Sequence, residues 1–498
     1  MSRYQNTLQS QPAGGFRHSR SDKRDILIAA LLWAALLGWL LSWHPFQRAL
    51  LLDAATWDSL SVGLAHGEIP YRDVFLHKTP GAAMLGALGV WVAEAFDKPG
   101  VFGAHAVFLA LGAAGPALLY LVCRVRLGVA AALTAALWFA AADVWTVAAL
   151  EGVRPKIATV VFGLGSLLAA GHARAAWAGI FATASALCWQ PGLVFGVGAV
   201  LELTFANSHP RRGQWFRFGF AASLVVAAFL IWLSIQGALS AFFADAIVFN
   251  REYVSTGLKP VAATASRLWS ILERLALPEV MIAMLAFPAI VLRRPAVPPG
   301  LALAGGLYLA IVFTSFQGWP DTLLLMPTIA MLLAVGTNAI LESVWPRRTV
   351  AIVCLLLAAW TVATPDWSRI RTPITYQEQS TTIASLMRRI PADQPIVAIG
   401  APEILLHSER GRDWPWPYFW FGVDRFAADQ SGGFKAMLDE LEALNPAMIV
   451  IARRWQGRYH DDFEVWAKQR YERSTFRVFP HTKSPCQVWL RRNSMTGL

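Results

Sequence analysis

The sequence is poor in charged residues. Asp, Glu, Lys and Arg together make up 15% of its 498 positions, whereas a soluble domain carries about a quarter. Hydrophobic residues supply 56%. The 22 Trp residues fit the same picture, because indole rings favour membrane interfaces. This composition excludes an ordinary water-soluble enzyme and indicates an integral membrane protein.

Cysteine is also scarce, and no nucleotide-binding motif is present. Three of the four Cys residues, Cys123, Cys188 and Cys354, fall inside apolar segments, and Cys486 has no obvious partner. This pattern gives neither a disulfide framework nor a metal-ligand spacing. The net charge of +11 comes from short basic clusters between apolar runs, which is typical of membrane-protein loops rather than of a nucleic-acid groove.

Eleven apolar runs have the character of membrane spans. They cover residues 26–43, 102–123, 127–146, 156–173, 175–189, 192–206, 218–236, 278–292, 300–316, 322–341 and 349–364. The polar residues 1–24 before them are expected to form a disordered cytoplasmic tail. The first run is too long for the core of a signal peptide, so we interpret it as a retained anchor.

Basic clusters in alternate loops set the predicted orientation. They contain Arg124 and Arg126, His172 and Arg174, Arg211, Arg212 and Arg217, Arg293 and Arg294, and Arg347 and Arg348. All five clusters fall on one side if the apolar stretch 81–96 lies at the interface or re-enters the membrane instead of crossing it. Because cytoplasmic loops are rich in Lys and Arg, this arrangement places the N-terminus in the cytoplasm and the C-terminus outside.

The predicted fold class is an α-helical multi-spanning membrane protein with about 11 transmembrane helices and a C-terminal α/β soluble domain. Residues 25–364 form the transmembrane domain, with a large outer loop at 45–101. Residues 365–498 contain strand-like runs at 395–400 and 447–452 and a helical pattern at 433–443, a βαβ-type alternation. We favour a stabilising or receptor-like cap over a catalytic role for this extracytoplasmic domain.

The first outer loop holds the most informative residues. A short helix from about 54 to 66 would place Trp57 and its apolar neighbours on one face, as in a helix that lies in the membrane interface. Asp53 would then stand at or next to the N-cap. Pro70 to Asp73 has turn chemistry, and Lys78-Thr79-Pro80-Gly81 would begin the next helix.

This arrangement resembles the membrane-embedded sugar transferases of the GT-C class. Within that class it is most similar to the family 39-like group, which includes protein O-mannosyltransferases and the lipid A aminoarabinose transferases. The resemblance covers roughly residues 25–345. Its motif positions are Asp53, Trp57, Gly67, Pro70 to Asp73 and Lys78 to Gly81, with weaker matches at Glu151, Gln317 to Asp321 and Leu325 to Pro327. One departure is Ala54, which stands where many relatives have a Glu after the first Asp.

The resemblance implies transfer of a sugar from a polyprenyl-phosphate donor to an acceptor hydroxyl on the outer face, usually with inversion. Such a reaction needs a carboxylate that takes the acceptor proton and cations that hold the departing phosphate. Asp53 is the expected general base, with an N-cap as its structural alternative. Four cations are expected to bind the donor phosphate: Arg72, Lys78, Arg154 and Lys156. Their alternative is contact with lipid head groups or with Asp73 and Glu151.

The remaining acidic and aromatic residues each have two interpretations. Glu151 is a catalytic candidate that orients the base or binds acceptor hydroxyls, or else forms a salt bridge to Arg154. Asp321 could contact the donor sugar or cap a helix, and Asp73 could bind substrate or brace its turn through Arg72. Trp57 and Tyr71 complete the expected substrate-binding set. Two further acids are expected outside the site. Asp58 should be in solvent, and Glu202, near the inner end of its span, should extend its carboxylate towards the inner surface.

No metal site is assigned, because His66 and His77 lack partners at ligand spacing. The wider class differs in metal dependence, so no cofactor is predicted with certainty and a divalent metal stays open. The expected partners are the polyprenyl-phosphate sugar, membrane lipids, and a lipid, glycan or protein acceptor, with no nucleic acid. The expected location is a bacterial inner membrane. The alternatives are a lipid or sugar transporter or flippase, which would need charged or broken helices at mid-membrane, and a non-catalytic scaffold.

Overall fold

The computed structural model describes residues 23–205, 212–251, 264–266, 297–315, 318–342, 349, 374–408, 410, 413–414, 432–451, 460–474 and 486–492. Almost all of the expected N-terminal tail, the predicted span 278–292 and nearly all of the predicted span 349–364 lie outside these residues. The count of eleven spans therefore stays a prediction.

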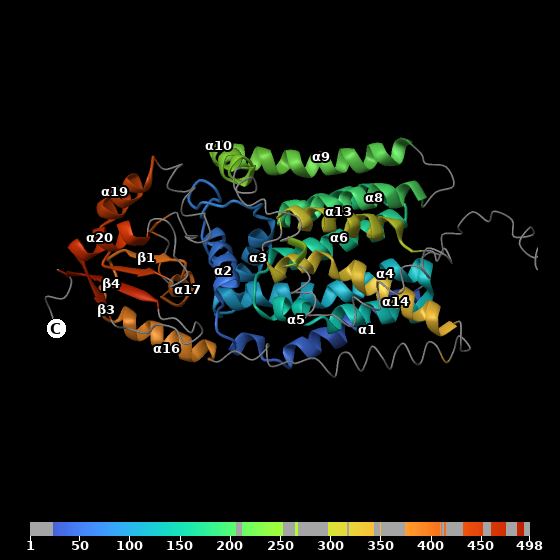
Figure 1. The fold of residues 1–498 in the computed structure, drawn as a ribbon, viewed down its shortest axis with the longest axis horizontal. Helices are drawn as coiled ribbons and strands as arrows, with labels where there is room; N and C mark the ends of the chain where they lie inside the picture. The colour runs from blue at the N-terminus through green and yellow to red at the C-terminus, as the bar shows by residue number, and fades with distance from the viewer. Residues whose placement is uncertain are drawn as a thin grey trace, which may run out of the picture.

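Nine helices of the described chain run side by side in an elongated bundle (Figure 1). They are α1 (Lys23–Leu41), α4 (Gly100–Ala141), α5 (Asp143–Leu150), α6 (Pro155–Gly171), α7 (Ala175–Cys188), α8 (Leu193–Phe205), α9 (Arg212–Ile235), α13 (Pro299–Ser315) and α14 (Met326–Glu342). The long α4 is divided at Gly128, whose φ of 82° belongs to the left-handed region that glycine adopts without strain.

Three described helices are long and apolar enough to cross a membrane: Lys23–Gln47, Gly100–Arg124 and Arg212–Ile235. A fourth candidate is the pair Arg126–Ala141 and Asp143–Leu150, which is bent by 59°. Only 11% of the first and third of these segments is buried, and the outer helix α9 exposes large apolar side chains along its length. Such surfaces are stable only in a lipid environment, so the bundle is a membrane domain.

The described basic residues of the first predicted inner loop lie at the bundle end where α1 begins. Arg124 Nε donates to Asp25 Oδ1 (2.9 Å), near the start of α1, and Arg126 pairs with Glu202 of α8 (2.5 Å). Glu202 also accepts the N–H of Gly300 (3.1 Å) and is buried. The expectation that this carboxylate extends towards the inner surface is wrong, because a guanidinium and a backbone N–H satisfy it inside the bundle.

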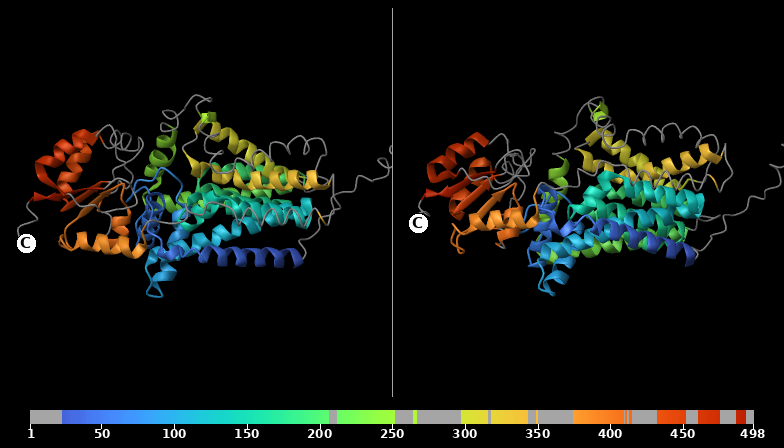
Figure 2. Two further views of the ribbon diagram at one scale, coloured as in Figure 1. Left: turned by 60° about the horizontal axis from the view of Figure 1, so that its bottom comes forward. Right: turned by 90° about the horizontal axis from the view of Figure 1, so that it is seen from below.

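Two further helices lie at the opposite end of the bundle, namely α2 (Leu52–Ala65) and α3 (Gly81–Glu94) (Figures 1 and 2). Helix α3 corresponds to the apolar stretch that the sequence analysis left out of the span count. It packs closely on α4, where a Cβ at Gly89 would stand 2.3 Å from the carbonyl oxygen of Gly103. The backbones can approach so closely because both positions are glycine.

The prediction that α2 lies in the membrane interface is wrong. Its side chains from Ala54 to Ser61 are all buried, with Trp57 exposed by 6% and Leu60 by 1%. Helix α2 is enclosed by α3, by α4 and by the C-terminal part of the chain. The apolar face expected from the sequence is covered by protein instead of lipid, and the polar side chains between the apolar residues are buried as well.

The C-terminal part forms a four-stranded mixed sheet with helices around it (Figure 1). Its strands are β1 (Ile396–Ile399), β2 (Met448–Ile451), β3 (Tyr471–Ser474) and β4 (Gln487–Arg491), in the order β1-β2-β4-β3. Its helices are α16 (Tyr376–Met387), α17 (Glu403–Ser408), α19 (Phe434–Leu444) and α20 (His460–Arg470). Strands β1 and β2 pair in parallel, and both lie in segments that the sequence indicated as strands. Alternate residues of these strands pack into two separate cores, one on each face of the sheet.

Helices α16 and α17 place this sheet against the end of the bundle that carries α2 (Figures 1 and 2). The contact includes an aromatic pair, since the Tyr376 ring lies 4.9 Å from the Phe102 ring of α4. Leu50, Ala55 and Val101 form a small buried core beside it. The segment just before α2 is therefore enclosed between the bundle and the C-terminal part.

Candidate functional site

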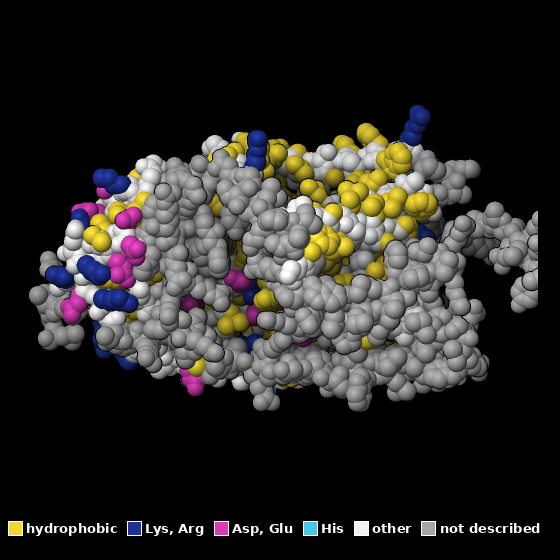
Figure 3. Space-filling view, in the orientation of Figure 1, with side chains coloured by type: hydrophobic (Ala, Val, Ile, Leu, Met, Phe, Trp, Pro, Cys, Tyr) yellow, Lys and Arg dark blue, Asp and Glu magenta, His cyan; other side chains and the backbone are white. Residues whose placement is uncertain are grey.

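The predicted site residues gather where the bundle meets the C-terminal part. Figure 3 shows acidic and basic side chains together in a recess between these two regions. Four structural elements supply them. These are α2, the loop 66–80, the turn 151–154 with the start of α6, and the 3₁₀ turn η4 (Trp319–Leu324). Residues that are up to 268 positions apart, from Asp53 to Asp321, thus belong to one end of the molecule.

Asp53 and Glu151 share one arginine. Arg154 Nη1 donates to Asp53 Oδ2 (3.3 Å), and Nη2 donates to Glu151 Oε2. The Asp53 side chain is 48% exposed, while that of Glu151 is 7% exposed. Burial works against the charge of Arg154, but the two carboxylates outweigh it and raise the pKa of Arg154. Asp53 is thus the accessible acid of the group, whereas the expected salt bridge of Glu151 is present.

Lys78 stands close to this group as an uncompensated cation. Among the described residues its Nζ has no hydrogen bond or ion pair, and it lies 5.8 Å from the centre of the Trp57 ring. Burial, together with the positive charge of Lys156, lowers the pKa of Lys78 to about 8. The carboxylates of Asp53 and Asp321 oppose this shift only in part. Lys78 is half-buried, and an ammonium partly removed from water without an anionic partner among the described residues is a position where a ligand anion gains binding.

Lys156, at the start of α6, is already paired. Its Nζ lies 2.5 Å from Asp321 Oδ1 and 4.4 Å from the centre of the Trp189 ring. Asp321 is 5% exposed and lies within η4, whose N-cap is Gly318, so the alternative of a helix cap at Asp321 is wrong. The pair joins α6 to η4 and places a second ammonium beside Lys78.

The two aromatic candidates contact different parts of Lys78: Trp57 lies near its ammonium, and Tyr71 binds its backbone. Trp57 projects from α2 and is almost completely buried. The hydroxyl of Tyr71 donates to the carbonyl oxygen of Lys78 (2.8 Å), and its ring meets Phe242 edge to face at 5.2 Å. Tyr71 has a φ of 70° and is 5% exposed. It therefore fixes the backbone that carries Lys78.

Arg72 and Asp73 form a bidentate pair in the same turn. Arg72 Nε donates to Asp73 Oδ1 (2.7 Å) and Nη2 donates to Oδ2 (2.8 Å). Asp73 Oδ2 also accepts the N–H of Ile69 (2.7 Å), and Arg72 Nη1 donates to the Gln236 carbonyl (3.2 Å). The alternative that Asp73 braces its turn through Arg72 matches this geometry. The two residues hold the turn and connect it to the end of α9.

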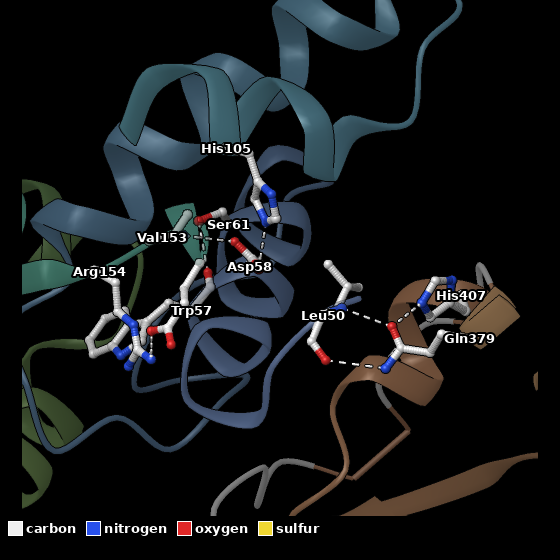
Figure 4. Close-up of polar contacts among 10 residues, drawn as sticks. Leu50, Trp57, Asp58, Ser61, His105, Val153, Arg154, Gln379 and His407 are labelled. Atoms are coloured by element: carbon white, nitrogen blue, oxygen red, sulfur yellow. Dashed lines mark hydrogen bonds and ion pairs between the residues drawn. The ribbon is translucent and has the colours of Figure 1, made fainter. Parts of the chain in front are cut away.

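Asp58 was expected in solvent, and this expectation is wrong. Its side chain is fully buried, and Oδ1 accepts the N–H of Val153 (3.1 Å) while Oδ2 lies 2.9 Å from His105 Nε2 (Figure 4). Gly152 has a φ of 113°, and a Cβ there would stand 2.4 Å from His105 Nε2. The physical reason is that Asp58 faces the turn 151–154, which needs a buried acceptor for a free backbone N–H.

Three further residues, His105, Gln379 and His407, lie around α2 in Figure 4 and were not predicted from the sequence. A polar residue in an apolar segment was the only signal available for His105. Gln379 and His407 fall in an ordinary polar region and gave no signal at all. In the described part of the chain, no group of three or more His, Cys, Asp or Glu side chains could hold a metal ion.

No family model matches the sequence, and no curated protein matches it. Solved structures are similar in fold. The undecaprenyl-phosphate-bound crystal structure of ArnT from Cupriavidus metallidurans is 14% identical, with a TM-score of 0.57 over 93% of this chain and 97% of ArnT. Its apo state gives 13% identity and a TM-score of 0.54 over 93% and 96% of the two chains.

A second similar protein comes from an archaeon. The Archaeoglobus fulgidus oligosaccharyltransferase, tethered to an acceptor peptide with an NVT sequon, is 11% identical, with a TM-score of 0.52 over 92% of this chain and 73% of that one. Both proteins are glycosyltransferases with the GT-C fold. The similarity runs through nearly the whole chain, so the chain described here has the GT-C fold.

Proposed function

We propose that this GT-C-fold chain is a glycosyltransferase that moves a sugar from a polyprenyl-phosphate donor to an acceptor hydroxyl at the outer face of a bacterial inner membrane. The observation that carries the proposal is Lys78, a half-buried ammonium without an anionic partner among the described residues, beside the exposed carboxylate of Asp53. One group can bind a phosphate and the other can accept a proton. Support for the donor class comes from ArnT, which has the same fold and was solved with undecaprenyl phosphate.

The proposed reaction is one displacement with inversion. The acceptor oxygen attacks the anomeric carbon, the bond from that carbon to the phosphate oxygen breaks, and the polyprenyl phosphate leaves. The proton of the acceptor hydroxyl passes to a carboxylate oxygen of Asp53. Removal of a general base lowers a rate by about 10²- to 10⁴-fold in typical enzymes.

In this proposal, three of the four predicted phosphate-binding cations stabilise the leaving group. Lys78 supplies a full charge, Lys156 adds a second ammonium, and Arg154 keeps one buried Nε donor that has no partner among the described residues. Arg72 is instead held by Asp73, and we assign it to the rim of the site. A charge held in a dry environment stabilises developing negative charge more strongly than the same charge does in water.

Other predicted residues orient this group. Glu151 keeps Arg154 charged and directed at Asp53, and Asp321 does the same for Lys156. The centre of the Trp57 ring lies 5.8 Å from Lys78 Nζ, and the Tyr71 hydroxyl binds the backbone carbonyl of Lys78. The prenyl chain of the donor would stay in the bilayer, which explains why these groups lie at one end of a membrane bundle.

The test is a transfer assay with the purified full chain and a panel of polyprenyl-phosphate sugars. Asp53→Asn should lose at least about 10²-fold in kcat. The matched control is Asp97→Asn, an exposed aspartate whose backbone φ of 54° asparagine also tolerates. Full activity of Asp53→Asn, or a wild type that is inactive on every donor, would overturn the proposal.

A further inference from the structure

The start of α2 has no cap of its own. The N-cap residue is Leu51, which cannot offer a side-chain acceptor, and no side-chain capping bond is formed there. Asp53 lies in the first turn of this helix and meets Arg154 only at 3.3 Å. Helix ends without caps fray easily. The backbone that leads into Asp53 is instead held by a contact from another part of the chain.

That part is Gln379 in α16. Leu50 N–H donates to Gln379 Oε1 (2.8 Å), and Gln379 Nε2 donates to the carbonyl oxygen of Leu50 (3.1 Å) (Figure 4). Both residues are at most 2% exposed. The side-chain amide thus pairs with Leu50 as a neighbouring strand would. Two hydrogen bonds to one residue fix its orientation as well as its position.

Gln379 is itself held from two directions. His407 Nε2 lies 2.9 Å from Gln379 Oε1, which already accepts from Leu50, so the imidazole is the donor in this contact. The His407 ring lies 4.5 Å from the Tyr376 ring, which in turn contacts Phe102 at the start of α4. The contact therefore joins α16, α17 and the bundle at the segment that precedes Asp53.

We propose that Gln379 is a positioning residue, through which the C-terminal part of the chain fixes the entry to α2 and hence the place of Asp53 against Arg154. The inference rests on the proposed function only where it uses Asp53 as the general base. The contact between Gln379 and Leu50 does not depend on that function. A displacement of about 1 Å in a reacting group can cost about 10²-fold in rate. The C-terminal part thus becomes necessary for the chemistry without touching the substrate.

The main test compares Gln379→Met with Gln377→Met in the full-length protein. Methionine is similar in length and helix propensity but cannot form these hydrogen bonds. Gln377 lies in the same helix, two positions earlier, and is exposed. Gln379→Glu is a second variant, because it keeps the acceptor for the Leu50 N–H and loses the donor to the Leu50 carbonyl.

Two measurements separate positioning from mere stability. Hydrogen exchange of the peptide that covers Leu50 should accelerate by at least about tenfold in Gln379→Met, by less in Gln379→Glu, and not at all in Gln377→Met. In the transfer assay kcat should fall by about 10- to 100-fold in Gln379→Met while KM for the donor stays within about twofold, because the cations that bind it lie on other elements.

The outcomes are distinct. Unchanged exchange at Leu50 in both Gln379 variants overturns the inference, whatever the activity. Faster exchange with unchanged kcat shows that the contact does not position Asp53 and also overturns it. If the wild type transfers no sugar, the proposed function fails, and the exchange measurement alone decides whether Gln379 fixes the entry to α2. If Gln379→Met does not fold, hydrogen exchange at Leu50 and kcat of Gln379→Glu decide whether Gln379 is a positioning residue.

Discussion

Helix α2 is held by two anchors that share one design and differ in charge. In the bundle anchor, Asp58 binds the N–H of Val153 and His105 Nε2. In the tail anchor, Gln379 binds the N–H of Leu50 and His407 Nε2. In each anchor one buried side chain thus holds one backbone N–H and one imidazole, Asp58 through its two carboxylate oxygens and Gln379 through Oε1 alone (Figure 4).

The difference in charge between Asp58 and Gln379 indicates which of the two anchors can open at the lower cost in free energy. A carboxylate at 0% exposure has to keep its partners, because an unpaired charge in a dry interior is very unfavourable. Opening one hydrogen bond of a neutral amide such as Gln379 costs less free energy. The bundle anchor therefore ties α2 to the turn of Glu151 and Arg154 as a fixed unit. The tail anchor is the weaker link, and it can vary without unfolding the bundle.

The largest effect should follow loss of the bundle anchor. Asp58→Ala leaves the Val153 N–H and His105 without their acceptor and should destabilise the protein by about 3 kcal/mol. We expect a clear drop in Tm in detergent and at least about 10²-fold less transfer. Asp58→Asn keeps an acceptor for Val153 and should lose less. Equal Tm values for wild type and Asp58→Ala would show that the anchor is not structural.

The bundle anchor can also be disturbed at Gly152, which packs against His105. Gly152→Ala introduces a Cβ within 2.4 Å of His105 Nε2 at a φ of 113°, so the Asp58–His105 contact must shift. Gly67→Ala is the matched control, because Gly67 has a φ of 96° but nothing within 4 Å of its Cβ. Backbone strain of about 1–2 kcal/mol is common to both variants. A Tm for Gly152→Ala no lower than that of Gly67→Ala would argue against close packing at this anchor.

The tail anchor should respond to pH. Burial lowers the pKa of His407 to about 4, from an ordinary value of 6.5. Because the folded state prefers the neutral imidazole, its contribution to stability is complete above pH 6.5 and is lost as pH falls towards 4. Local opening at Leu50 should increase by up to about tenfold per pH unit in this window. Hydrogen exchange, corrected for the intrinsic rate, measures it, and His407→Gln should flatten the response.

The smallest effect concerns Lys78, which belongs to neither anchor. Its pKa of about 8 is raised when an anion binds, so donor affinity should be constant below pH 8. Above pH 8 the KM for the donor should rise by up to about tenfold per pH unit. Gln379→Met should leave this inflection unchanged. A KM that is flat between pH 7 and pH 9.5 would remove Lys78 from the phosphate site.

The sequence indicated which charged residues gather at one end of the bundle, but not what holds them there. Asp53, Lys78, Arg154 and Lys156 were identified from motif spacing and charge, and they lie at one end of the bundle. Asp58 was assigned to solvent because a single carboxylate on a short helix is usually exposed. Its true environment depends on Gly152 in the turn 151–154 and on His105 in α4, which leave no local pattern around Asp58.

The sequence alone indicated a membrane protein, and it predicted most of the candidate catalytic and phosphate-binding groups in the loops after the first and third predicted spans, with Asp321 in a later one. Hydropathy and turn chemistry are local properties, and a few neighbouring residues suffice to express them. The tertiary structure was needed to show which of these groups are paired within the described residues, that Lys78 has no ion pair among them, and what holds them. Lys156 meets Asp321 across 165 positions and Gln379 meets Leu50 across 329. Such pairs form because packing brings distant backbones together, and no local periodicity records them.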